Sequence, residues 1–135
     1  DIIASDHAPH LLSEKEGDAL SAPSGRPGMQ YQLPLRLDLY SPELVARLTA
    51  VNPAKIFKID RRGVLKKGYF ADLVRIKKQE HTISDSDVLS LCGWTPLAGV
   101  TVGHVVVSTW VNGVLSFDNG KVSEKISSKA LKFNN

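Results

Sequence analysis

The sequence predicts an α/β fold that begins with one buried strand and a group of helices and ends in an antiparallel sheet. An apolar run occupies residues 1–5, helix-start signals recur between residues 33 and 57, and strand and hairpin signals dominate from residue 60 onward. Such a change marks the border between two structural layers. We therefore expect two parts, residues 1–59 and residues 60–135. At 135 residues the chain is too short for a complete α/β barrel, which needs about 200 residues or more.

The first element is the run Asp1-Ile2-Ile3-Ala4-Ser5, which is typical of a fully buried parallel strand. A strand of this kind needs neighbours to satisfy its backbone hydrogen bonds. Residues 7–28 are rich in Pro, Ser, Gly and charge, and they predict an irregular loop of a length often found at active sites. Because the chain begins with Asp inside a strand, we expect a fragment or a processed product.

Helices are predicted next. The apolar spacing over residues 33–40 fits a strand or a helix, but Pro34 argues against a central strand and favours a helix of about three turns with Pro34 in its first turn. Ser41 followed by Pro42 is an N-cap signal for a second helix. Asn52-Pro53 repeats that start signal and predicts a further short helix over residues 53–57.

The second part has the pattern of an antiparallel sheet. Residues 71–76 predict a strand, and the Ser- and Asp-rich stretch 82–91 predicts a short helix or turn. Residues 105–117 predict a hairpin, because Asn112-Gly113 separates two apolar runs. The Lys- and Ser-rich tail, residues 123–135, is expected to pack loosely.

Composition excludes several classes of protein. The net charge is only +3 and no basic stripe is present, so we expect no nucleic-acid partner. No apolar run approaches the roughly 18 residues that span a membrane, so we expect no membrane partner. A single cysteine, Cys92, excludes an internal disulfide framework and a cysteine-rich metal site. The sequence therefore predicts a soluble protein of the cytoplasm.

The densest cluster of reactive side chains is Asp6-His7-Ala8-Pro9-His10, directly after the predicted first strand. Catalytic groups gather at this end of parallel strands. An aspartate there can hold a divalent metal and exchange a proton, and a nearby histidine can bind an anionic substrate. Asp6 could equally cap a turn, and the cluster could be solvated or structural. A local zinc site is disfavoured because Pro9 stiffens the segment and no fourth ligand is near.

The motif Ile3-Ala4-Ser5-Asp6-His7-Ala8-Pro9-His10 resembles the signature that closes the barrel of dihydroorotases, which are cyclic amidohydrolases. Residues 52–57 and 63–74 resemble a C-terminal motif of the wider superfamily. The histidine four residues after the aspartate points to dihydroorotase rather than to hydantoinase or allantoinase. The resemblance implies the C-terminal fragment of a metal-dependent hydrolase (β/α)8 barrel, with its last strand and closing helices, plus part of a small β-sandwich.

The resemblance also implies roles for single residues. Asp6 matches the aspartate that ligates one zinc ion and acts as general base, then general acid, while a zinc-held hydroxide attacks the ring amide of dihydroorotate. His10 matches the histidine that contacts the substrate carboxylate. Pro23, Ser24 and Gly25 lie where the family presents backbone groups to the substrate. The product would be carbamoyl aspartate, in de novo pyrimidine biosynthesis.

The family's remaining ligands are absent from this chain: an N-terminal His-x-His pair, a metal-bridging lysine and two later histidines. A catalytic zinc takes three protein ligands, so we expect the 135 residues alone to be inactive. The expected partners are dihydroorotate or carbamoyl aspartate, the remainder of the same polypeptide, and a second copy in a homodimer. A hydantoinase- or allantoinase-type enzyme and a non-catalytic dihydroorotase-like scaffold protein remain as alternatives.

Overall fold

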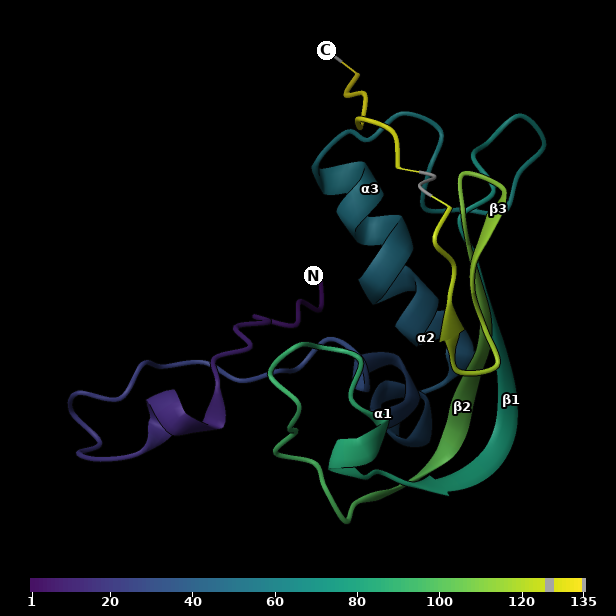
Figure 1. Cartoon of the computed structure of the whole chain (residues 1–135). Helices are drawn as coiled ribbons and strands as arrows, with labels where there is room; N and C mark the ends of the chain where they lie inside the picture. The colour runs from purple at the N-terminus through teal and green to yellow at the C-terminus, as the bar shows by residue number, and fades with distance from the viewer. Residues whose placement is uncertain (126–127, 135) are drawn as a thin grey trace.

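The computed structural model describes residues 1–125 and 128–134. Helices lie against one antiparallel sheet, and the long loop that follows the N-terminal segment extends away from both (Figure 1). The helices are η1 (Leu12–Lys15), α1 (Gln32–Leu39), α2 (Pro42–Ala46), η2 (Arg47–Val51), α3 (Asn52–Ile56) and η3 (Asp85–Asp87), and the strands are β1 (Leu73–Thr82), β2 (Thr101–Val111), β3 (Val114–Asp118) and β4 (Lys121–Val122). No described helix is long and apolar enough to cross a membrane.

The predicted helices are confirmed, with one correction. Pro34 lies in the first turn of α1, and the Ser41 hydroxyl accepts a hydrogen bond from the Leu44 N–H at 3.3 Å, as an N-cap should. Asn52-Pro53, however, does not begin a new helix. The N–H of Asn52 donates to the carbonyl of Arg47, five residues earlier, so α2, η2 and α3 form one continuous run with a π-type turn. Pro53 has no N–H to donate, and a widened turn before it accommodates that loss.

The sheet confirms the predicted hairpin and extends it. Its order is β1-β2-β3-β4, with neighbours antiparallel. Asn112 and Gly113 have φ of 52° and 82°, the left-handed values that a tight two-residue hairpin turn requires. The described residues form this single sheet, so the second sheet of a β-sandwich stays a prediction.

The predicted buried strand at residues 1–5 is wrong for this chain. The segment forms no strand, and Ile2 is 40% exposed. It is held by hydrogen bonds to helices: Ile3 N–H donates to the Leu48 carbonyl at 3.0 Å, the Asn52 amide donates to the Asp1 carbonyl at 2.6 Å, and the Gln32 amide of α1 donates to the Ala4 carbonyl at 2.8 Å. A strand needs a neighbouring strand, and the described residues place none beside it.

The tail was predicted to pack loosely, and its described end instead pairs with the segment after α3. Asp60 N–H donates to the Lys132 carbonyl and Asn134 N–H donates to the Lys58 carbonyl, both at 2.8 Å. Residues 126–127 and 135, which belong to the same tail, lie outside the described residues. The division at residues 59 and 60 stays a prediction.

The core lies between α1, the end of β1 and the start of β2. Tyr31, Ile83 and Val102 are buried there, with Leu35 and Leu97 packed against them. Tyr31 directly precedes α1 and also ends the long loop, so the same core that joins helix to sheet also anchors the loop that carries the candidate site.

Candidate active site

Asp6 lies in a strained backbone position on the surface. Its φ is 46°, in the left-handed region that few residues other than glycine adopt, although aspartate tolerates it better than most. The residue is exposed. Strain of this kind persists where neighbouring contacts impose it, and it is found most often at functional sites. The carboxylate of Asp6 is therefore held outward and accessible to a ligand.

On either side of Asp6, contacts join residues 5–8 to residues 25–28. His7 and Arg26 form a parallel bridge, and Ala8 N–H donates to the Arg26 carbonyl at 3.1 Å. Gly25 makes the approach possible: its φ is 103°, and a Cβ there would lie 2.4 Å from the Ala8 Cβ. The motif and the following loop, predicted separately to meet at one site, thus lie side by side.

His7 supports this arrangement through its ring. Its Nδ1 accepts hydrogen bonds from the backbone N–H groups of Gly28 at 3.2 Å and Met29 at 3.4 Å. An Nδ1 that accepts carries no proton and is turned into the loop. The His7 ring therefore holds the segment after Arg26 in this structure.

The predicted substrate-contacting residues Pro23, Ser24 and Gly25 form an irregular segment beside Lys15. The ammonium of Lys15 donates to the Pro23 carbonyl and, at 2.7 Å, to the Gly25 carbonyl. These two carbonyls are hydrogen-bonded within the loop, and Ser24 between them is exposed. A role for the three residues in substrate binding stays a prediction, and sequence reasoning missed Lys15 because no short motif signals a lysine that binds carbonyls eight and ten residues away.

His10 is half-buried and held on both sides. Its ring Nδ1 lies 3.6 Å from the Glu14 carboxylate, and its backbone N–H donates to the Ala8 carbonyl at 3.0 Å. Its own carbonyl accepts the indole N–H of Trp94 at 2.8 Å. Sequence reasoning missed this last contact too, because 84 residues separate the partners.

His81 and His104, the other two histidines of the chain, each lie beside an aspartate. His81 Nε2 is 3.0 Å from Asp87 Oδ2, and His104 Nδ1 is 2.6 Å from Asp38 Oδ1. Burial alone would raise the pKa of Asp38, but hydrogen bonds from the Gly103 N–H and His104, with the charge of His104, lower it overall. The first pair joins β1 to η3, and the second joins α1 to β2. Both are far from Asp6 in sequence.

The residues of this chain do not fit a self-contained zinc site. Within residues 1–125 and 128–134, no three His, Cys, Asp or Glu side chains converge as metal ligands. A catalytic zinc takes three protein ligands. Asp6 could supply one ligand at most, so what the chain itself offers is one accessible carboxylate, a half-buried imidazole and a lysine-bound turn on one loop.

Comparison with known proteins gives consistent relatives. A family model described as the amidohydrolase family matches residues 1–115. A dihydroorotase from Halobacterium salinarum is 40% identical over 129 residues, which cover 91% of this chain and 30% of that protein. A dihydroorotase from Methanosarcina acetivorans is 41% identical over 108 residues, which cover 74% of this chain and 23% of that protein.

Among solved structures, the L-hydantoinase (dihydropyrimidinase) from Arthrobacter aurescens matches with a TM-score of 0.79 at 26% identity. The match covers 91% of this chain and 30% of that chain. The chain therefore spans less than a third of the length of the proteins it resembles.

Proposed function

The chain belongs to the amidohydrolase family, and on that premise we propose that it is the C-terminal portion of a dihydroorotase. The reaction is the reversible hydrolysis of the cyclic amide of dihydroorotate to carbamoyl aspartate, in de novo pyrimidine biosynthesis in the cytoplasm. One observation carries the proposal: over 91% of the chain, identity is 40% to a dihydroorotase but 26% to a structurally matching hydantoinase. If the whole protein holds zinc, Asp6 would supply one oxygen ligand, and the metal would polarise the amide carbonyl.

Asp6 is the proposed proton carrier. An exposed carboxylate can accept a proton from the attacking water and deliver it to the ring nitrogen that leaves, so the same group serves both directions of the reaction. Its backbone is left-handed, with φ of 46°, and it lies two residues before Ala8, which approaches Gly25 closely. This preorganisation supports a catalytic role.

His10 is the proposed contact for the substrate carboxylate. An imidazole can donate a hydrogen bond to a carboxylate, and the backbone on both sides of His10 is held by hydrogen bonds. Pro23, Ser24 and Gly25 are proposed to line the same site from the opposite side of the loop, where their backbone would approach the ring. A homodimer is proposed from the family alone.

The proposal is tested with the full-length protein assayed for dihydroorotate hydrolysis. Asp6→Asn should lower kcat by about 10²- to 10⁴-fold, because a positioned acid–base group contributes that much. Asp18→Asn, another aspartate of the same loop, is the matched control and should change kcat less than twofold. His10→Ala should raise KM for dihydroorotate more than it lowers kcat.

Other outcomes would favour the other functions. Hydrolysis of hydantoin without hydrolysis of dihydroorotate would identify a hydantoinase-type enzyme. The structural match to a hydantoinase, with a TM-score of 0.79, is the observation that favours this alternative. An absence of turnover with any cyclic amide in a well-folded full-length protein would identify a scaffold. Turnover by residues 1–135 alone would contradict the proposal that the remaining metal ligands lie elsewhere.

A further inference from the structure

We propose that the connection between β1 and β2, residues 83–100, is the support that holds the candidate substrate-binding segment in place, and that Trp94 is its positioning residue. The inference rests on the proposed function, because it treats His10 as the residue that contacts the substrate. It concerns two segments that are far apart in sequence, residues 83–100 and the loop of residues 5–28 (the candidate loop). Hydrogen bonds join them at His10, near the start of the loop, and at Gln30, just after its end.

The first attachment is made by Trp94. Its indole N–H donates to the carbonyl of His10 at 2.8 Å, a normal distance for a strong N–H to O bond. The indole has this one polar hydrogen and no acceptor, so its orientation is set by the bond it makes. The carbonyl belongs to the residue whose imidazole is proposed to contact the substrate. Any shift of Trp94 therefore moves the backbone from which the imidazole extends.

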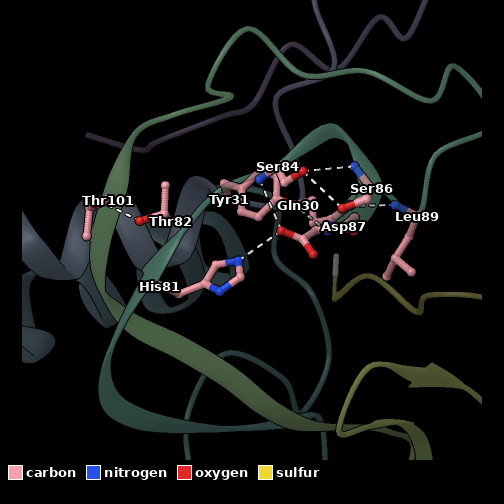
Figure 2. Close-up of polar contacts among 9 residues, drawn as sticks. All are labelled: Gln30, Tyr31, His81, Thr82, Ser84, Ser86, Asp87, Leu89 and Thr101. Atoms are coloured by element: carbon pink, nitrogen blue, oxygen red, sulfur yellow. Dashed lines mark hydrogen bonds and ion pairs between the residues drawn. The ribbon is translucent and has the colours of Figure 1, made fainter.

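The second attachment is made by Gln30 at the other end of the loop (Figure 2). Its Oε1 accepts the Leu89 N–H at 2.9 Å, and its Nε2 donates to the Asp87 carbonyl at 2.7 Å. One side-chain amide thus satisfies a donor and an acceptor of the support, as a neighbouring strand would. With Trp94, this fixes the candidate loop at two points.

The support is itself rigid enough to act in this way. Asp87 Oδ2 accepts the Ser84 N–H and contacts His81 Nε2, both at 3.0 Å (Figure 2). Asp85 Oδ1 accepts the N–H of Thr95, which is almost fully buried, at 2.8 Å. These bonds link β1, η3 and the residue next to Trp94 into one network, and Ile83 anchors it in the core.

The two segments also close around a small cavity. Its volume is about 10 Å³, enough for about one water molecule, and His7, Pro27 and Tyr31 line it from the loop side while Val88, Trp94 and Thr95 line it from the support. Trp94 thus packs beside the loop residues as well as bonding to the His10 carbonyl. A small misplacement of a substrate-contacting group weakens substrate binding.

The test compares two tryptophan variants in the full-length protein. Trp94→Phe keeps an aromatic ring and removes the indole N–H, while Trp110→Phe makes the same change in β2. The bond from Trp94 is made to the His10 carbonyl, whereas the His10 N–H donates to the Ala8 carbonyl, so loss of the indole N–H should loosen the backbone at His10 indirectly. Hydrogen exchange should show the His10 amide exchanging about 3- to 10-fold faster in Trp94→Phe than in wild type. In Trp110→Phe, exchange at His10 should be unchanged.

Steady-state kinetics separate positioning from general stability. Trp94→Phe should raise KM for dihydroorotate about 3- to 10-fold and leave kcat within twofold, whereas Trp110→Phe should change neither. A fall in kcat at constant KM, or unchanged exchange at His10 in Trp94→Phe, would overturn the inference. If wild-type protein does not hydrolyse dihydroorotate, the proposed function fails, and exchange at His10 still decides whether residues 83–100 support the loop.

A second variant covers the case in which Trp94→Phe does not fold. Gln30→Glu keeps the acceptor for the Leu89 N–H and removes the donor to the Asp87 carbonyl. Hydrogen exchange at the Leu89 amide should accelerate less than twofold, and exchange at the His10 amide by about twofold or more. KM for dihydroorotate should rise by a factor similar to that at His10. Exchange and KM equal to wild type would contradict the two-point attachment.

Discussion

The four-stranded sheet and the candidate loop are held in different ways. In the sheet, β2 pairs antiparallel with β1 and β3, with register shifts in both pairs, and backbone groups of neighbouring strands bond to one another. In residues 5–28, the loop depends on side chains that reach distant backbone groups: the Lys15 ammonium, the His7 ring and the Trp94 indole each bind backbone atoms at least eight positions away. The sheet is held mainly by backbone hydrogen bonds between strands, whereas the loop depends on the side chains of particular residues.

This difference separates stability from function along the chain. Buried apolar residues cluster between α1 and the sheet, while Asp6 is exposed and His10 is half-buried on the loop. We expect substitutions in the core to lower the free energy of unfolding and substitutions in the loop to change local order and substrate binding. The predictions below test that separation.

The largest effect on stability is expected for Ile83→Ala. Ile83 is 1% exposed and packs with Tyr31 and Val102, so its truncation removes buried surface and leaves a cavity. The free energy of unfolding should fall by about 2–5 kcal/mol, measured by urea denaturation. The control is Leu91→Ala in the same connection, since Leu91 is fully exposed and should change stability by about 0.5 kcal/mol or less.

The same experiment can contradict the comparison. If Leu91→Ala is as destabilising as Ile83→Ala, the exposed surface of the connection is covered by another part of the whole protein. If neither variant matters, the core between α1 and the sheet does not hold this region together.

The next effect is expected for Gly25→Ala in the candidate loop. The new Cβ would meet Ala8 at 2.4 Å in a backbone conformation with φ of 103°, so we expect a cost of about 1–3 kcal/mol that is confined to the loop. Hydrogen exchange at the Ala8 amide should accelerate. Gly17→Ala is a closely matched control, because Gly17 has φ of 106° and no atom within 4 Å of an added Cβ. Equal acceleration at Ala8 in both variants would show that strain, and not the close approach, is responsible.

A smaller, pH-dependent effect is expected at Asp38, which joins α1 to β2. Because its folded-state pKa lies below the ordinary value of 3.8, the unfolded state takes up the proton first, and the stabilisation present at neutral pH is lost as pH falls below about 4. Asp38→Asn should cost about 1 kcal/mol at pH 7, through the weakened bonds to Gly103 and His104. The difference in unfolding free energy between wild type and Asp38→Asn should shrink between pH 5 and pH 2. A constant difference would contradict this assignment.

The sequence predicts the locally determined elements of the molecule better than the contacts that hold the loop. Asn112-Gly113 and Ser41-Pro42 predict a hairpin and a helix start because the conformation depends on those residues alone. The apolar run at residues 1–5 does not become a strand, since pairing requires a neighbour that no local pattern supplies. The motif predicts Asp6 and His10 as a site, but the bond from Trp94 to His10 arises from the fold and has no local signal.

The smallest effect is expected for Glu14→Gln, which probes the ion pair within the candidate loop. Glu14 lies 3.6 Å from the His10 ring, and both side chains are more than a third exposed, so the pair should contribute less than about 0.5 kcal/mol to the free energy of unfolding. Glutamine keeps an oxygen for the Leu11 N–H, which Glu14 accepts at 2.7 Å. The unfolding midpoint in urea should therefore stay within error of wild type, while KM for dihydroorotate changes because the charge beside His10 is gone. A loss above about 1 kcal/mol would show that the loop is coupled to global stability as tightly as the core, and the separation between the two regions would fail.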